Sequence, residues 1–358
     1  MEEEVQKASS EVKKAWPVVM SWVGGISAII GLIAGIAGGV NWYQNRHRQQ
    51  AELQSKMAMA QIQVNQGEYQ AAIQSYAEIL KADSLYQPAL DQQLNAVMLW
   101  VENFRIAARD NQNSAELAGP ELDQIMSILD AGFARTKGSQ AADVQAHIGW
   151  AHWLNQHIAE REFGPAAEQN LRAALAIDPS NVYANAMLGN WMLQNGKSLA
   201  EASQHFDTAV ATGKARPLVR QLELGSFIDL DKAGARASLV KIANDMRKSN
   251  EPLADRDRSS ILSFCFNPSL TDHQELVESL SAVPADEAWQ TYLWLDNQPE
   301  RDETRSLIHD FIHANLLEIA GRQQEALQAY RLLQKELKDH PGSMANAVNA
   351  AVARLTRT

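Results

Sequence analysis

The chain has 358 residues, of which 46% are hydrophobic and 21% charged, and its net charge is −11 at neutral pH. This composition is typical of an ordered protein with a large buried core. The acidic balance argues against a general nucleic-acid-binding protein, which needs a basic face, so we expect no nucleic acid partner. The only cysteine, Cys265, lies in the apolar stretch ILSFCFNP, which favours a buried structural thiol over a reactive one.

The first element expected along the chain is a membrane-spanning helix, preceded by a short polar tail at residues 1–15. Residues 18–40 contain no charged side chain. At a rise of 1.5 Å per residue, this stretch is long enough to cross roughly 30 Å of hydrocarbon, and aromatic residues stand near both of its ends. We therefore expect residues 16–43 to form a transmembrane helix and residues 44–52 a juxtamembrane linker. A buried core helix and a cleavable signal peptide are the alternatives.

Small residues recur at every fourth position in this segment and fall on one stripe of a helix: Ser27, Gly31, Gly35 and Gly39. Helices associate in lipid by close packing, which small residues permit, so the stripe predicts a homo-oligomer or a partner helix. An ordinary single-span anchor with incidental glycines is the alternative. Lysine and arginine are equally frequent on the two flanks. Because a short cytoplasmic tail is the simpler insertion route, we expect the C-terminal part on the extracytoplasmic side.

The rest of the chain repeats a spacing of glycine, alanine and an aromatic residue. Three copies keep this order: Gly67, Ala72 and Tyr76; Gly196, Ala202 and Phe206; Gly321, Ala326 and Tyr330. A fourth copy has Ala167 and Leu171 and closes with Asp178-Pro179. The pattern resembles the tetratricopeptide repeat (TPR), a helix-turn-helix unit of about 34 residues. The resemblance implies that the glycine permits the turn between two helices, the alanine lets the helices approach, and the aromatic residue fills the gap to the next unit.

The resemblance implies an all-α, TPR-like helical-repeat solenoid over residues 53–358. The clear copies cover four ranges: 53–86, 143–180, 182–216 and 307–341. Residues 217–306 are expected to be a divergent helical region, because Leu224-Gly225 stands at the expected place in a first helix but no matching series follows it. An apolar helix over residues 343–356 is expected to cap the array.

A solenoid of helix pairs has a concave face that is lined mainly by the first helix of each pair. The groove-facing positions of the family fall here on a set of polar and aromatic side chains: Gln61, Asn65, Tyr183, Asn190, Gln194, Phe311 and Asn315. The amides of the asparagine and glutamine residues in this set are able to hydrogen-bond the backbone of an extended peptide, so we expect this face to bind a protein partner. Solvated side chains that touch no ligand are the alternative.

No motif in the sequence carries chemistry, so we expect no enzyme, no cofactor and no metal site. The stretch Gly196-Lys197-Ser198 resembles the end of a phosphate-binding loop, but such a loop needs glycine where Trp191 stands. His309 and His313 share a helix face, and no third metal ligand accompanies them.

The sequence thus predicts a single-pass membrane protein in which a TPR-like scaffold holds a protein partner at the lipid bilayer. This organisation is similar to that of bacterial single-span repeat proteins of the inner membrane, which implies a role in envelope assembly or in chaperoning near a translocon. The alternative is an oligomerising membrane effector or complex subunit, in which the glycine-rich helix is the working part and the TPR domain is a sensor.

Overall fold

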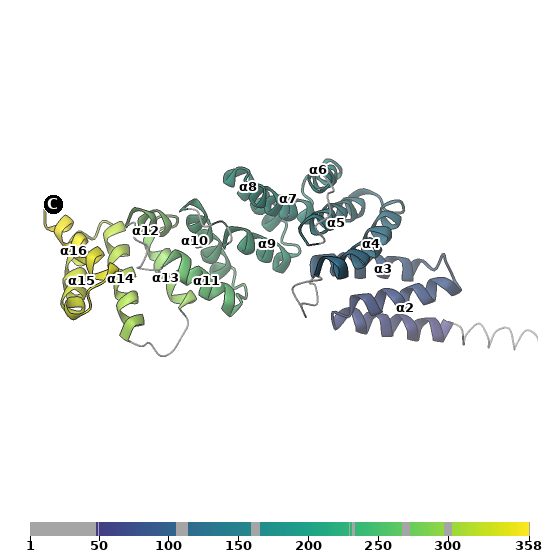
Figure 1. Ribbon diagram of the computed structural model, residues 1–358, viewed down its shortest axis with the longest axis horizontal. Coiled ribbons are helices and arrows are strands. Elements are labelled where there is room, and N and C mark those ends of the chain that lie inside the picture. The colour runs from purple at the N-terminus through teal and green to yellow at the C-terminus, as the bar shows by residue number, and fades with distance from the viewer. Residues whose placement is uncertain are drawn as a thin grey trace, which may run out of the picture. The chain divides into compact units, whose positions relative to one another are not determined.

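The structure, a computed structural model, describes residues 48, 50–104, 114–158, 165–228, 230, 233–266, 273–296 and 303–357. These residues form helices and their connections and contain no strand, which confirms the all-α prediction. The chain divides into two compact units, Met1–Asn103 and Phe104–Thr358 (Figure 1). The predicted transmembrane helix at residues 16–43, with its stripe of small residues, lies outside the described residues. Among the described residues, no helix is both long enough and apolar enough to cross a bilayer.

The first unit contains a helix through residues 50–65, then α2 (Tyr69–Ala82) and α3 (Gln87–Glu102), which pack against each other. The turn before α2 depends on Gly67, which has a left-handed φ of 78°. The Gly67 N–H donates to the Val64 carbonyl at 3.0 Å, and the Glu68 N–H donates to the Gln63 carbonyl at 2.9 Å. This is the helix end that glycine favours, because a Cβ is strained at such a φ.

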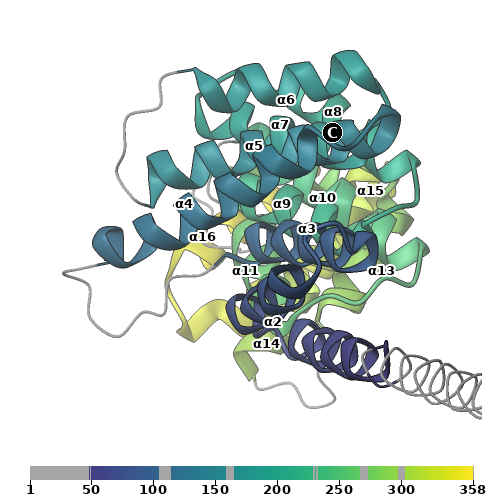
Figure 2. The same ribbon diagram turned by 90° about the vertical axis from the view of Figure 1, so that its right-hand side faces the viewer.

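The second unit continues with thirteen α-helices and one short 3₁₀ turn among the described residues. They are α4 (Ser114–Phe133), α5 (Gly138–His157), α6 (Ala166–Ile177), α7 (Val182–Gln194), α8 (Leu199–Ala211), α9 (Arg216–Ile228), α10 (Ala233–Lys248), α11 (Asp255–Cys265), α12 (His273–Leu280), α13 (Ala285–Leu295), α14 (Glu303–Ile319), α15 (Gln323–Glu336), η1 (Leu337–Asp339) and α16 (Ser343–Thr356). The strongest packing joins successive helices, as in α5 with α6, α7 with α8, and α14 with α15. Figure 2 shows α5 and α6 side by side.

The helix pairs α7–α8 and α14–α15 share the turn of the first unit. Gly196 and Gly321 have φ values of 67° and 76°. After each glycine the next N–H reaches five residues back: Lys197 donates to the Met192 carbonyl at 2.8 Å, and Arg322 donates to the Leu317 carbonyl at 3.0 Å. The turn role expected of these glycines is therefore confirmed.

Two further glycines let the paired helices approach closely in the middle of a first helix. A Cβ added at Gly189 would lie 2.9 Å from the ring of Phe206, and one at Gly149 would lie 2.9 Å from Leu171 Cγ. These distances are shorter than van der Waals contact allows, so each glycine is needed where its partner helix crosses. Phe206 and Leu171 are fully buried in consequence. The alanine and aromatic positions of the clear copies, such as Ala326 and Tyr330, are also fully buried.

The regular pattern lapses at α9. A Cβ added at Gly225 would meet no atom of the described residues within 4 Å, and Leu224-Gly225 lies two residues further along α9 than Leu188-Gly189 does along α7. The following helix, α10, has no aromatic residue that fills this space in the way that Phe206 fills the space over Gly189. Instead α9 contacts α7, α8, α10 and α11, and a groove remains beside Gly225.

The single cysteine is part of the core of this second unit. Cys265 is completely buried, and its thiol donates to the Arg236 carbonyl at 3.6 Å. Burial raises the pKa of the Cys265 thiol well above its usual range. The prediction of a buried structural thiol is therefore confirmed.

Candidate partner-binding grooves

Three of the seven predicted partner-binding residues, Gln61, Asn65 and Gln194, are at least partly exposed. Gln61 is half-buried and Asn65 exposed, and the Gln61 Nε2 donates to the Asn65 Oδ1 at 3.2 Å. Gln194 is exposed at the end of α7. Contact of these three side chains with a partner stays a prediction.

Three other predicted residues are interior. Asn190 is 7% exposed, and its Nδ2 donates to the Ser226 Oγ at 2.6 Å, which links α7 to α9. Phe311 and Asn315 are 2% and 1% exposed, and the Asn315 Nδ2 donates to the Phe311 carbonyl at 2.8 Å. Neighbouring helices pack over these positions. The prediction used residue spacing within a single helix, which does not show whether another helix covers a side chain. These three side chains are therefore covered by the protein's own helices and do not face a partner in this structure.

The seventh predicted residue, Tyr183, lines a polar groove of about 640 Å³ between α5, α7 and α8. Its ring centroid lies 4.6 Å from that of His147. Asn181 orders this groove, because its Oδ1 accepts the Ala184 N–H at 2.8 Å and its Nδ2 donates to the Asp143 Oδ1 at 2.6 Å. Burial raises the pKa of Asp143, although the hydrogen bond from Asn181 opposes this.

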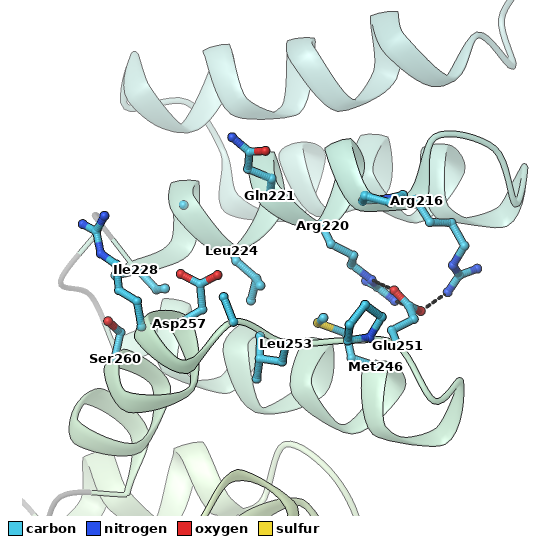
Figure 3. Close-up of a pocket in the computed structure, with 15 residues that line it drawn as sticks. Arg216, Arg220, Gln221, Leu224, Ile228, Met246, Glu251, Leu253, Asp257 and Ser260 are labelled. Atoms are coloured by element: carbon cyan, nitrogen blue, oxygen red, sulfur yellow. Dashed lines mark hydrogen bonds and ion pairs between the residues drawn. The ribbon is translucent and has the colours of Figure 1, made fainter. Parts of the chain in front are cut away.

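A larger groove, of about 720 Å³, lies between α9 and α11 (Figure 3). Its lining on α9 runs from Arg216 to Ile228, and its opposite side is formed by residues 251–254 and the start of α11. The floor is apolar, because Leu224 and Met246 are almost completely buried beneath it and Leu253 is half-buried. An elongated groove with an apolar floor and polar ends is suited to a peptide segment or another flexible ligand.

One end of this α9–α11 groove is closed by a buried ion cluster. Arg216 and Arg220 both pair with Glu251, and the Arg220 Nε lies 3.1 Å from the Glu251 Oε2 (Figure 3). Arg220 also pairs with Asp245 and, at 2.6 Å, with Glu223. The Arg220 and Glu223 side chains are only 7% and 6% exposed. The cluster therefore fixes α9 to the end of α10 and to the segment that follows it.

The carboxylates of this cluster differ in their proton affinity. Burial raises the pKa of Glu223 to about 6, although the charge of Arg220 opposes the shift. Burial also acts on Glu251, but hydrogen bonds from Arg220 and Arg216 outweigh it and lower the pKa of that carboxyl. At neutral pH the guanidinium of Arg220 is thus fully engaged by carboxylates and is not available to a ligand.

The opposite end of the α9–α11 groove has free polar groups. The Asp257 carboxylate points into the groove, and Ser260 lies beyond it on α11 (Figure 3). Within the described part of the chain, these two side chains make no hydrogen bond or ion pair, so a ligand finds polar groups there. Gln221, the neighbour of Arg220 on α9, is exposed and lies nearer the middle of the groove (Figure 3).

The described residues include no group of three or more His, Cys, Asp or Glu side chains that is able to hold a metal. His309 and His313 lie instead against Trp289, with ring centroids 4.7 and 4.6 Å from the indole. These histidines therefore have a packing role between α13 and α14.

Sequence reasoning missed the α9–α11 groove, since its residues belong to the stretch where the repeat pattern lapses. The only local signal was Gly225, a mid-helix glycine without an aromatic residue at the expected interval behind it. Comparison with known proteins adds no assignment, because no family model matches the chain and no curated protein matches it significantly.

Proposed function

We propose that the protein is a membrane-anchored, TPR-like scaffold that binds a protein partner through its helical repeats and holds it at the bilayer. The single observation that carries the proposal is a stack of helix pairs with open grooves of about 720 and 640 Å³ between its helices. Grooves of this kind suit an extended or helical segment of another protein. The charge-free stretch at residues 18–40 supports the anchor.

Site-specific photo-crosslinking in native membranes tests the partner. A photoreactive residue is placed singly at Asn65, Gln194 or Gln221, which are exposed on first helices, and at Gln169 on the second helix α6 as a matched control. The proposal expects a discrete cross-linked protein at one or more of the first-helix positions and none at Gln169. Equal cross-linking of many proteins at all positions contradicts a specific scaffold.

Fractionation and protease protection test the anchor and its sidedness. The full chain is expected in the membrane fraction after alkaline extraction, and its repeat region is expected to be digested in intact spheroplasts. Release of the chain by alkali contradicts the anchor, and a protected repeat region places it in the cytoplasm.

The second candidate is an oligomerising membrane effector, favoured by the spacing of Ser27, Gly31, Gly35 and Gly39 in the sequence. Here Gly35→Leu separates the two candidates. Under the scaffold proposal, partner cross-linking at Gln194 and activity in cells both persist. Under the effector proposal, cross-linking persists while defined oligomers and activity are lost.

A further inference from the structure

The glycines in the middle of first helices fall into two classes. The space beside Gly149 and Gly189 is occupied by Leu171 and Phe206 of the partner helix. Among the described residues, no atom lies within 4 Å of a Cβ added at Gly225, and this glycine lines the α9–α11 groove. A mid-helix glycine is unfavourable for the helix, and it is useful where another backbone comes close. At Gly225 there is room for a second backbone to approach from the groove.

The dimensions of the groove favour an extended peptide. Its lining on α9 runs from Arg216 to Ile228, which is about 18 Å along the helix axis at 1.5 Å per residue. An extended chain that rises about 3.3 Å per residue covers this length with roughly five or six residues. The apolar floor formed by Leu224, Met246 and Leu253 offers a seat for one aliphatic side chain.

One carboxylate of the groove favours a basic residue on the peptide. The charged side chains that line the groove are three guanidinium groups, those of Arg216, Arg220 and Arg256, and two carboxylates, those of Glu251 and Asp257. Arg216 and Arg220 are already paired with Glu251, whereas the Asp257 carboxylate points into the groove without an ion pair among the described residues (Figure 3). The net charge of −11 on the whole chain favours the approach of a basic segment.

We propose that the α9–α11 groove binds an extended segment of a partner protein, with its backbone over Gly225, an aliphatic side chain on the Leu224, Met246 and Leu253 floor, and a lysine or arginine at Asp257. This inference rests on the proposed scaffold function and names the chemistry of the partner segment. It differs from the surface predicted by the sequence, because none of the seven predicted residues lines this groove.

The test is a selection of displayed random twelve-residue peptides on the full chain in detergent, followed by affinity measurement with the selected synthetic peptides. The expected peptides share an aliphatic residue with lysine or arginine a few positions away. Gly225→Leu fills part of the groove and should weaken the binding of these peptides at least about tenfold. The fold should tolerate the change, because leucine is a good helix former and its Cβ meets no atom of the described residues within 4 Å. Gln290→Leu, which adds the same side chain at an exposed position of α13, should leave binding unchanged.

A charge exchange tests the contact at Asp257. Asp257→Lys should weaken the binding of the lysine-containing peptide about tenfold. The same variant should bind a peptide in which glutamate replaces that lysine. Circular dichroism of each variant, compared with the unsubstituted chain, shows that the helices are intact.

The outcomes separate this inference from the scaffold proposal. Selected peptides that bind Gly225→Leu as well as the unsubstituted chain overturn the α9–α11 site and leave the scaffold standing. Enrichment of acidic peptides overturns the inference that the bound segment is basic. The same inference is overturned if the glutamate-containing peptide fails to bind Asp257→Lys. A selection that enriches no peptide overturns the site altogether, and the photo-crosslinking experiment then decides on the scaffold by itself.

Discussion

Replacement of Arg220 by methionine should destabilise the second unit strongly and in a pH-dependent manner. The Arg220 side chain is 7% exposed and pairs with Glu223, Glu251 and Asp245. Arg216 still serves Glu251 after the change, and Asp245 is half exposed, so Glu223, at 6% exposed, is the carboxylate that loses its cation. Leaving one partner of a buried pair without the other costs about 3–5 kcal/mol. We expect the lower end of that range, because Glu223 is able to take up a proton instead.

The sign of the pH dependence follows from Glu223. Its pKa in the folded chain is about 6, above the value of 4.5 for an unperturbed glutamate, so folding favours the protonated form. The stabilising effect of this proton, about 2 kcal/mol, is fully present below pH 4.5 and is lost as the pH rises through 6. Loss of Arg220 raises the pKa of Glu223 further, so the damage should be larger at pH 8 than at pH 5.

Urea unfolding of the full chain in detergent, followed by circular dichroism at pH 5 and pH 8, measures both effects. Glu223→Gln removes the buried charge, so the double substitution of Arg220→Met with Glu223→Gln should recover most of the loss at pH 8. If Arg220→Met loses less than about 1 kcal/mol of unfolding free energy at pH 8, or loses the same amount at both pH values, the reasoning is refuted. The cluster would then not contain a buried carboxylate that depends on Arg220 for its charge.

Three further predictions concern glycine and cysteine. Gly196→Ala should destabilise the fold by about 1 kcal/mol, because the φ of residue 196 is 67°, a left-handed value that strains alanine. Gly225→Ala should stabilise the fold by up to about 1 kcal/mol, because alanine is a better helix former than glycine and its Cβ enters open space. The two substitutions should shift the midpoint of thermal unfolding in opposite directions, and shifts of the same sign contradict this reasoning. Gly189→Ala should cost about 1–3 kcal/mol through contact with Phe206, measured in the same assay, and a neutral result would show that the helices separate easily. Cys265 should react with a thiol reagent only after the chain unfolds, because it is fully buried; labelling of the folded chain contradicts this.

The features that sequence reasoning predicted well depend on a few neighbouring residues. A tight turn after a helix needs a left-handed residue, and Gly67, Gly196 and Gly321 supply it within the turn itself. Helix periodicity also identified an all-α chain, because each amphipathic face is visible within one helix. These predictions succeeded because they depend only on residues close together in the sequence and not on contacts with distant parts of the chain.

The features that it missed depend on which helices meet. Whether Asn190 and Asn315 are open or buried is decided by helices far along the chain, such as α9, whose Ser226 bonds Asn190. The ion cluster likewise joins Arg220 to Asp245 and Glu251, which lie on different elements. A single sequence contains the residues of such a cluster but not their pairing.

A lapse in a repeat has a physical use that a perfect repeat lacks. In regular pairs, the residue over the mid-helix glycine comes from the next helix, as Phe206 does at Gly189, so the space is filled and the surface recurs from unit to unit. Where α10 supplies no such residue, the space over Gly225 opens and the surface becomes unique to that point of the array. A partner that recognises one place on a repetitive scaffold needs such a difference, because specificity is a difference in affinity between competing sites. Under the proposed function, the lapse at α9 would let the partner bind at one position along the array, and the binding measurement on Gly225→Leu tests this directly.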